Sequence, residues 1–359
     1  MNILFIHQNF PGQFKHLAPA LVSLGHDVTA FVLTKTDARQ WNGVKLIHYS
    51  LDRGNAKEAH PWAVDFESKV IRGEACLRAA LALKKQGYTP EVIAAHPGWG
   101  ESLFLKEVWP EAKLKLYCEF FYDARGADVG FDPEYSSSDP ADAGRVTLKN
   151  ANTLLQFQQA DAGISPTHWQ ASTFPPHIQE KITVIHDGID TEVLRPNPSV
   201  RFKLDNGQAL SRDDEVITFV NRALEPYRGF HVFMRSLPKL LAAKPHAQVL
   251  IVGKEGVSYG AQPPSGKSWE TQFCDEVMPQ LTAQQRDRIH FLGNIEYARF
   301  ISLIQVSRVH VYLTYPFVLS WSLLEAMSVG CSIVASDTQP LHEAIKHEET
   351  GKLVDFFDP

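Results

Sequence analysis

Short apolar runs alternate with stretches of helical periodicity along almost the whole chain, and no other feature constrains its fold as strongly. Strands are predicted in the first half over Ile3–His7, Asp27–Leu33, Lys45–His48, Val92–His96, Leu114–Cys118, Ala162–Ser165 and Thr183–His186. A second series is predicted over Val216–Asn221, Gln248–Gly253, Ile289–Leu292, Val309–Leu313 and Ser332–Ser336. Amphipathic stretches such as Phe14–Leu24, Phe66–Gln86 and Val232–Ala243 lie between them. Strands that alternate with helices form parallel sheets with right-handed crossovers, so the pattern predicts an α/β protein.

The two series of strands are separated by a segment that has the composition of a linker. It contains Pro196, Pro198, the pair Asn206-Gly207 and a charged run over 212–215. We therefore expect two doubly wound, Rossmann-like domains over residues 1–195 and 215–359, joined by a linker over 196–214. Such domains would face each other across a cleft lined by the carboxyl edges of their sheets. Residues 351–359 have the pattern of a strand followed by a turn, so we expect the second domain to be truncated at its C-terminal end.

Composition narrows the class of protein. Of the 359 residues, 44% are hydrophobic and 21% are charged, as in soluble globular proteins, and the formal net charge of −6 argues against a nucleic-acid binder. No apolar run is long enough to span a membrane, and Met1–His7 begins as a strand without a basic leader. The cysteines form no Cys-x-x-Cys pair, which favours a reducing, cytoplasmic compartment. No metal-ligand spacing occurs, so no metal ion and no cofactor are predicted.

The segment 315–330 is the strongest functional signal. A helix is predicted to begin near Ser320 directly after a strand, with Ser320 and Ser322 as candidate caps. The N-terminus of a helix at the carboxyl end of a strand favours a phosphate, because unpaired N–H groups and the helix dipole both attract an anion. Glu325 follows within about one turn and suits sugar hydroxyls. Phosphate and ribose recognition together indicate a nucleotide; the alternative is a buried helix with an incidental glutamate.

Two arginines follow the first strand of the second series. Arg222 ends that strand and Arg228 lies in the next loop. Guanidinium groups are permanently charged and bind phosphate oxygens in a fork, so this pair suits a diphosphate; the alternative is a surface arginine paired with Glu225. Gly253 and Lys254 follow the next strand, where glycine permits close approach of a ligand and lysine could reach a phosphate. A plain turn between strand and helix is the alternative there.

Residues at strand ends in the first half indicate a second part of the site. Gly12 lies in the turn after the first strand and could let backbone N–H groups face a phosphate, or could simply form a turn. His96 ends a strand and could act as a base or contact a sugar, or be a buried structural histidine. The loop 119–134 combines aromatic and acidic residues, as sugar sites do, and its candidates are Glu119, Asp123 and Asp128. A solvated loop is the alternative.

The stretch Phe66–Gln86 carries several basic residues among apolar ones. Such a helix could contact an anionic membrane surface, which would place the protein at the inner face of the membrane. The alternative is a helix that packs on the core by one face and exposes its charges to solvent.

Several segments together resemble the retaining glycosyltransferases of family 4, which have the GT-B architecture. The similarity extends over essentially the whole chain and is strongest in Val184–Asp190, Phe219–Gly229, Phe291–Gly293 and Leu323–Met327. The resemblance implies that Arg222 binds the donor diphosphate and that Arg228, where the family usually has lysine, has the same partner. It implies that Glu325, as the second glutamate of the Glu-x₇-Glu element, holds the ribose hydroxyls.

The resemblance assigns further residues to the donor. It places Ser320, Trp321 and Ser322 at the helix start that meets the phosphates. Asn294 and Ile295 lie where the backbone reads the base in the family. Gly12 corresponds to the first-domain glycine near the diphosphate, and His96 lies near the acceptor-side histidine region.

One position departs from the family pattern. Eight residues before Glu325 the family usually has a glutamate that contacts the donor sugar, and here that residue is Phe317, which cannot accept hydrogen bonds from sugar hydroxyls. The resemblance implies a retaining hexosyltransferase that moves a sugar from a UDP- or GDP-linked donor to a glycan, a lipid-linked acceptor or another hydroxyl. It places the reaction in bacterial polysaccharide or glycoconjugate synthesis, without a metal ion. A nucleotide-sugar 2-epimerase and a non-catalytic sugar-nucleotide-binding homologue are the alternatives.

Overall fold

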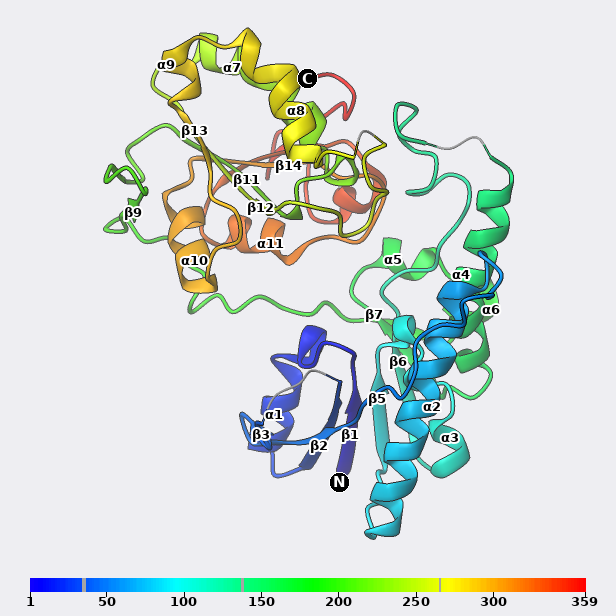
Figure 1. Cartoon of the computed structure of the whole chain (residues 1–359). Coiled ribbons are helices and arrows are strands. Elements are labelled where there is room, and N and C mark those ends of the chain that lie inside the picture. Colours follow the sequence, from blue (N-terminus) through cyan, green and yellow to red (C-terminus); the bar gives the residue numbers. More distant parts are fainter. Residues whose placement is uncertain (34–36, 137–138, 265) are drawn as a thin grey trace. The chain divides into compact units, whose positions relative to one another are not determined.

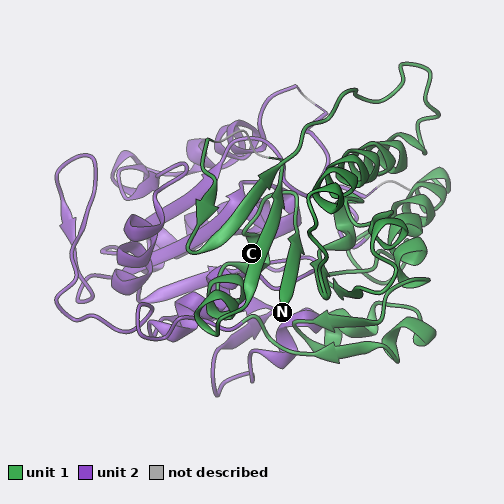
Figure 2. Cartoon of the chain, turned by 90° about the horizontal axis from the view of Figure 1, so that it is seen from below, with its two compact units in different colours: residues 1–130, 137–187 green, residues 131–136, 188–359 purple. Residues whose placement is uncertain are grey.

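The chain forms two compact units (Figure 2). The computed structural model describes residues 1–33, 37–136, 139–264 and 266–359. Unit 1 comprises residues 1–130 and 137–187, and unit 2 comprises residues 131–136 and 188–359. A short piece of the first half of the sequence therefore belongs to the second unit.

Unit 1 contains a largely parallel sheet with the strand order β3-β4-β2-β1-β5-β6-β7-β8 (Figure 1). Its strands are β1 (Asn2–Ile6), β2 (Asp27–Val32), β3 (Gln40–Trp41), β4 (Val44–His48), β5 (Val92–Ala95), β6 (Lys113–Tyr117), β7 (Ala162–Ser165) and β8 (Ile182–Val184). Among the described pairs of this sheet, only β3 and β4 are antiparallel. This is the doubly wound arrangement that the sequence predicts.

Helices cover both faces of this sheet. They are η1 (Gly12–Phe14), α1 (Leu17–Ser23), α2 (Val64–Lys85), η2 (Pro97–Trp99), α3 (Leu105–Val108), α4 (Ala141–Phe157), α5 (His168–Ser172) and α6 (Pro176–Gln179). Successive residues of β1 point to opposite faces, because side chains alternate along a strand. Phe5 accordingly packs in one core with Ala18 of α1, whereas Leu4 packs in another with Cys76 and Ala80 of α2.

Unit 2 contains a parallel sheet with the order β13-β12-β11-β14-β15-β16. Its strands are β11 (Val216–Ala223), β12 (Gln248–Lys254), β13 (Ile289–Phe291), β14 (Val309–Tyr312), β15 (Ser332–Ser336) and β16 (Lys352–Val354). Its helices are η3 (Pro226–Arg228), α7 (Phe230–Ala243), α8 (Trp269–Val277), η4 (Met278–Gln280), α9 (Ala283–Arg286), α10 (Tyr297–Val306), α11 (Trp321–Ser328) and η5 (Gln339–Glu343). The order is that of a Rossmann-type sheet.

One face of this sheet packs against α10 and α11, through a core that includes Val220, Leu303 and Leu323. Beside α7, a cavity of about 890 Å³ is lined by apolar residues of β11, β14 and β15, together with basic and acidic side chains at its margin. The last two residues of the chain, Asp358 and Pro359, also line it.

The division of the chain differs in detail from the one expected from the sequence. The units divide at residues 187 and 188 rather than at 195. The segment 196–214, expected as a linker, lies in unit 2 and contains the antiparallel pair β9 (Phe202–Lys203) and β10 (Ala209–Leu210). Phe202 and Leu210 are buried in the unit 2 core, so apolar contacts give structure to a segment rich in turn residues. Among the described helices, none is both long and apolar enough to cross a bilayer.

Candidate active site

The strand order places a switch point in each sheet. In unit 1 the order reverses between β1 and β5, and in unit 2 it reverses between β11 and β14. Ligands of doubly wound sheets bind outside the carboxyl ends of the strands at such points, because the loops there diverge to opposite faces. The residues that follow these strands are therefore the candidates for function.

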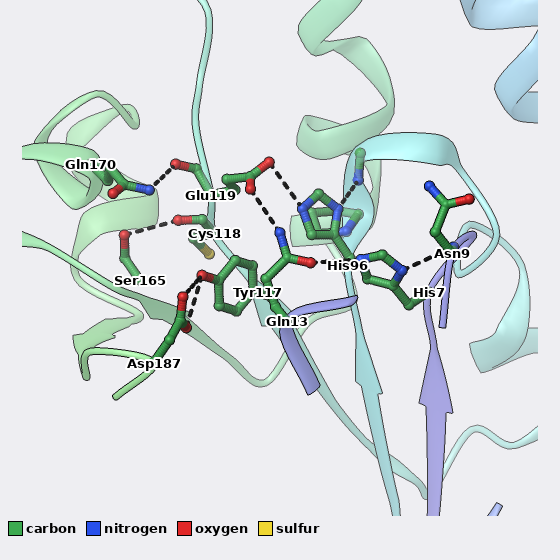
Figure 3. Close-up of polar contacts among 12 residues, drawn as sticks. His7, Asn9, Gln13, His96, Tyr117, Cys118, Glu119, Ser165, Gln170 and Asp187 are labelled. Carbon is green, nitrogen blue, oxygen red and sulfur yellow. Dashed lines mark hydrogen bonds and ion pairs between the residues drawn. The ribbon is translucent and has the colours of Figure 1, made fainter. Parts of the chain in front are cut away.

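In unit 1 a histidine follows each of the two strands at the switch point. His7 follows β1 and His96 follows β5, both are buried, and their ring centroids lie 5.4 Å apart (Figure 3). Trp99 packs on both rings, with its centroid 4.8 Å from His7 and 4.4 Å from His96. The sequence predicts His96 here, whereas His7 was not among the predicted site residues. The signal that would have found His7 is its position as the polar residue directly after an apolar strand.

Backbone hydrogen bonds set the tautomers of the two rings. The Asn9 N–H donates to His7 Nδ1 at 3.0 Å, and the Gly98 N–H donates to His96 Nδ1 at 3.1 Å. Because each Nδ1 accepts a hydrogen bond, the neutral ring carries its proton on Nε2. His7 Nε2 therefore donates to Gln13 Oε1 at 2.6 Å, and His96 Nε2 donates to Glu119 Oε2 at 3.3 Å (Figure 3).

Glu119 closes this network. Its Oε1 accepts from Gln13 Nε2 at 2.7 Å, and its backbone carbonyl accepts from Gln170 Nε2 at 2.7 Å. Burial raises the pKa of Glu119, but the hydrogen bonds and charge of His96 and the hydrogen bond from Gln13 outweigh it, and the pKa lies below its usual value. Burial and the neighbouring His96 lower the pKa of His7 to about 4. Near neutral pH this edge thus carries a charged Glu119 carboxylate and a neutral His7 imidazole.

Gly12 is required by the packing of His7. Its φ is +47°, and a Cβ at this position would lie 2.3 Å from His7 Cε1. No larger residue fits without moving the imidazole ring. The turn therefore places Gly12 against the histidine, and a diphosphate contact of Gly12 stays a prediction.

The other acidic candidates lie outside this hydrogen-bond network. Asp123 accepts from the Arg125 N–H at 3.0 Å and so stabilises a local turn. Asp128 is buried, and its charge opposes the fall in the pKa of Lys149 that burial causes. Of the predicted acceptor-side residues, the structure brings together only Glu119 and His96.

In unit 2 the predicted donor residues follow adjacent strands. Arg222 lies near the end of β11 and Lys254 ends β12, and both are exposed. Asn294 is exposed and Ile295 half-buried in the turn between β13 and α10. These residues therefore line one carboxyl edge, as the sequence predicts. Gly253 packs closely there, since a Cβ would lie 2.6 Å from Leu224 Cδ2.

Arg228 is buried beneath the loop that joins β14 to α11. Its guanidinium donates to Tyr312 Oη at 3.0 Å, to Thr314 Oγ1 at 2.6 Å and, from two nitrogens, to the Val318 carbonyl at 3.2 Å. Arg228 forms no ion pair with a carboxylate among the described residues, although its charge opposes the rise in the pKa of Glu225 that burial causes. The acceptors are all neutral, so the positive charge remains uncompensated by a direct ion pair. The sequence predicts a phosphate contact for Arg228, which stays a prediction; the structure shows that Arg228 holds the loop.

Glu225 pairs with backbone rather than with an arginine. It is fully buried and accepts from the N–H groups of Ser258, Tyr259 and Gly260 at 3.0, 3.1 and 2.9 Å. Burial raises the pKa of Glu225, although these hydrogen bonds oppose the rise. Neither predicted arginine forms an ion pair with it in the part of the chain that the structure describes. Glu225 therefore fixes the loop after β12.

Helix α11 begins at the predicted place. Ser320 is its N-cap, with Oγ accepting from the Ser322 N–H at 3.3 Å, and the Ser320 N–H donates to Tyr312 Oη at 2.9 Å. Trp321 is the first helical residue. Glu325 is buried one turn later and accepts from Tyr297 Oη at 2.7 Å. Tyr297 begins α10, two residues after Ile295, so Glu325 is linked to the turn expected to read the base.

Phe317 belongs to an aromatic cluster and not to the open edge. Only 2% of it is exposed, and its ring centroid lies 5.1 Å from Tyr227 and 5.0 Å from Tyr259. Its ring also lies 5.4 Å from the Arg228 guanidinium carbon. The residue that departs from the family pattern therefore packs beside the buried arginine.

Several basic residues of α2 are engaged within unit 1. Lys69 is buried, pairs with Asp65 at 2.7 Å and donates to the Lys149 carbonyl at 3.0 Å. Lys84 donates to the Val108 carbonyl at 2.5 Å. These contacts account for part of the basic pattern that suggested a membrane surface.

Comparison with known proteins identifies the family. Residues 25–194 match the family model described as "Glycosyl transferase family 4 group", and residues 200–359 match "Glycosyl transferases group 1". The phosphatidyl-myo-inositol mannosyltransferase of Mycolicibacterium smegmatis is 28% identical over 147 residues, which are 40% of this chain and 33% of that protein. The D-inositol 3-phosphate glycosyltransferase of Acidothermus cellulolyticus is 25% identical over 184 residues, which are 50% of this chain and 38% of that protein. Each of these two matches thus covers well under half of the length of the curated relative.

Solved structures share the fold. The sucrose-phosphate synthase of Thermosynechococcus elongatus superposes with a TM-score of 0.69 at 17% identity, over 100% of this chain and 86% of that one. Anabaena HepE, solved in complex with UDP and glucose, superposes with a TM-score of 0.62 at 15% identity, over 99% of this chain and 86% of that one. The likeness to these solved structures shows that the chain has the GT-B architecture. The two family models show that the chain belongs to the family 4 glycosyltransferases.

Proposed function

We propose that this glycosyltransferase moves a sugar from a nucleoside diphosphate sugar to a hydroxyl acceptor with retention of configuration at the anomeric carbon. The observation that supports this most directly is the content of the unit 2 edge. An exposed Arg222, the buried charge of Arg228, the N-terminus of α11 and the carboxylate of Glu325 all follow strands at or next to the switch point. This set matches the parts of a nucleoside diphosphate: two phosphates and a ribose.

The cations would act on the leaving group. Negative charge grows on the β-phosphate as the glycosidic bond breaks, and preorganised positive groups stabilise that charge as it develops. Arg222 is free to approach a phosphate because it is exposed. Arg228 supplies a fixed charge that costs no reorganisation, because the loop already holds its guanidinium. We propose that these groups, with Lys254 and the N–H groups of α11, take the place of a divalent ion.

The rest of the donor would lie along the same edge. Glu325 has one carboxylate oxygen bonded to Tyr297, which orients the group toward ribose hydroxyls. The backbone of Asn294 and Ile295 would contact the base, next to Tyr297 in sequence. Gly253 would permit close approach of the donor at the end of β12.

The acceptor would bind at the unit 1 edge. A charged Glu119 accepts hydrogen bonds from hydroxyl groups, and the Gln13 and His96 donors hold its two oxygens in place. The curated relatives are named for phosphatidyl-myo-inositol and D-inositol 3-phosphate, both rich in hydroxyl groups, which supports a polyol, glycan or lipid-linked acceptor. The departing phosphate would help to take the acceptor proton, so no side chain need act as the base.

A donor panel with a matched pair of variants tests the proposal. UDP-, GDP- and ADP-sugars would be tested for thermal stabilisation and for release of the nucleoside diphosphate, with and without EDTA. Arg222→Ala should lower kcat/KM by about 10²–10³. Arg145→Ala is the control, since this exposed arginine of α4 pairs only with Asp142 among the described acidic residues. No stabilisation by any donor, or equal activity of the two variants, would refute the proposal; product without acceptor that is an isomerised donor would indicate an epimerase.

A further inference from the structure

Residues 131–136 lie in the first half of the sequence but pack entirely within unit 2. The Phe131 ring lies 5.2 Å from Tyr315 and 5.3 Å from Phe356. The Tyr135 ring lies 5.0 Å from Trp269 of α8. We call this segment, residues 131–136, the clip. Apolar contacts at both of its ends hold it against unit 2, so its central residues have fixed positions.

Asp132 is the polar centre of the clip. It is 3% exposed, and its Oδ2 accepts from Tyr315 Oη at 2.8 Å and from His231 Nε2 at 3.1 Å. Its Oδ1 accepts from the Glu134 N–H at 3.0 Å. A buried carboxylate with three donors is fully satisfied, and each donor is oriented by the charge it faces. Tyr315 and His231 are consequently held by a residue from a distant part of the sequence.

Tyr315 connects Asp132 to the loop between β14 and α11. Its N–H donates to the Tyr227 carbonyl at 3.1 Å, and its ring centroid lies 4.9 Å from that of Tyr227. Tyr227 in turn packs on Phe317, which lies beside the Arg228 guanidinium. The loop is thus fixed by Arg228 at Thr314 and Val318 and by Asp132 at Tyr315 in between.

The clip makes a second charged contact, which does not involve this loop. Glu134 accepts from Arg235 of α7 through both oxygens, at 2.7 and 2.8 Å, and Arg235 also pairs with Glu276 of α8. The clip therefore offers two charged contacts, one that touches the donor-side loop and one that does not.

We propose that Asp132 is a positioning residue for the β14–α11 loop, and so for the diphosphate site that this loop adjoins. The expected effect on donor binding rests on the proposed function. The expected effect on the conformation of the loop does not depend on it. Through Tyr315, Asp132 keeps the residues between β14 and the first turn of α11 in the conformation that presents the helix N-terminus. Its loss would weaken donor binding, whereas loss of the Glu134 contact would leave donor binding unchanged.

Three variants separate positioning from general stability. Asp132→Asn keeps the size of the residue but removes the charged acceptor for Tyr315 and His231. Tyr315→Phe removes only the hydroxyl group, and it tests the same contact if Asp132→Asn does not fold. Glu134→Gln is the matched control, because it breaks a charged contact of the same clip at a partly exposed position.

Hydrogen exchange by mass spectrometry would be measured on peptides that cover 313–322, together with KM and kcat for the donor. Asp132→Asn and Tyr315→Phe should each speed exchange in these peptides and raise the donor KM by about tenfold, with kcat within about twofold of wild type. In the double variant, the effects of Asp132→Asn and Tyr315→Phe on exchange and on the donor KM should not add, since both substitutions break the hydrogen bond between Tyr315 and Asp132. Equal exchange in Asp132→Asn and Glu134→Gln would overturn the inference. If the wild type binds no nucleoside diphosphate, the proposed function fails, and the exchange data still decide the positioning role.

Discussion

The carboxyl edges of the two sheets are built from different kinds of groups. In unit 1, three titratable side chains and one amide form one connected hydrogen-bond network: His7, Gln13, Glu119 and His96. In unit 2, the groups proposed to meet the diphosphate are a buried arginine held by neutral oxygens, the exposed Arg222 and Lys254, and the backbone N–H groups at the start of α11. The same fold thus carries a side-chain hydrogen-bond network in one unit and permanent charge with backbone donors in the other.

The difference corresponds to two kinds of ligand. Hydroxyl groups both donate and accept, so a network of carboxylate, amide and imidazole can recognise them and can respond to protonation. A diphosphate accepts only, and it keeps its charge over the physiological range, so fixed cations and N–H groups suffice. We expect the properties of unit 1 to depend on pH and those of the unit 2 edge to depend on the geometry of one buried charge.

The largest expected effect concerns that buried charge. Arg228→Met would leave three buried acceptors, on Tyr312, Thr314 and Val318, without their donor and should lower the free energy of unfolding by about 3–5 kcal/mol, since each unsatisfied buried group costs about 1–3 kcal/mol. Arg228→Lys keeps the charge but has a single ammonium group in place of the guanidinium donors. It should lower the free energy of unfolding by about 1–2 kcal/mol. Urea unfolding of the two variants measures the difference. If both variants lose the same free energy of unfolding, the charge of Arg228 does not contribute to the stability of unit 2.

The pH dependence of stability should reveal a buried histidine in each unit. Burial, with His96, lowers the pKa of His7 to about 4, and burial lowers that of His310 to about 4. Each stays neutral in the folded protein while the unfolded chain takes up a proton below its ordinary value of 6.5. The unfolded state therefore binds more protons between these values, so stability is fully present above pH 6.5 and falls as the pH is lowered toward 4. Each histidine should contribute a loss of about 3 kcal/mol.

The two histidines differ in their surroundings, and this difference separates their effects. His310 lies within β14, with Nδ1 bonded to Thr218 Oγ1 at 2.9 Å and no partner for Nε2 among the described residues. His7→Gln and His310→Gln should each flatten the curve of unfolding free energy against pH between 6.5 and 4. A curve that stays as steep as in the wild type in both variants would contradict the assignment to these groups.

The parallel sheets and the ends of several strands could be predicted from the sequence. Most predicted strands of the two series are apolar runs that end at a polar residue or a glycine, and these local signals do not depend on tertiary contacts. The start of α11 at Ser320 was predicted for the same reason, because a serine cap precedes a helical pattern. His96 was predicted from its position at the end of a strand and Glu119 from the aromatic and acidic residues of the loop 119–134, and the two side chains lie within hydrogen-bond distance.

Other features depend on contacts between distant residues and could not be predicted from a single sequence. The bond between Gln13 and Glu119 joins residues 106 positions apart. The burial of Arg228 follows from Tyr312 and Thr314, which belong to another strand and its loop. The position of the clip depends on the fit of Phe131 and Tyr135 to aromatic residues of unit 2. The sequence indicated only a loop of aromatic and acidic residues there, and not the unit on which it packs.

A smaller effect is expected at the unit 1 edge. Glu119→Gln keeps the shape of the side chain but removes the charge that faces His96, and it should lower kcat by about tenfold if the acceptor binds there. Because the pKa of Glu119 lies below its usual value, the wild type should keep this contribution until the pH falls well below 4.5. Glu107→Gln, an exposed change in the same unit, is the control. Initial rates at several pH values would test this, and an unchanged kcat would remove Glu119 from the acceptor site.

The smallest effect should come from the cap of α11, and it separates stability from binding. Ser320→Ala removes the Oγ that accepts from the Ser322 N–H and should cost about 1 kcal/mol or less. Thr282→Ala removes the capping box of α9 and should cost a similar amount. Only Ser320→Ala should also change the affinity for a nucleoside diphosphate, because the freed N–H groups lie where the phosphates are proposed to bind. Calorimetric titration of both variants with UDP, GDP and ADP would show this; equal affinities would mean that the start of α11 serves the fold alone, and the proposed phosphate site would then depend on the arginines.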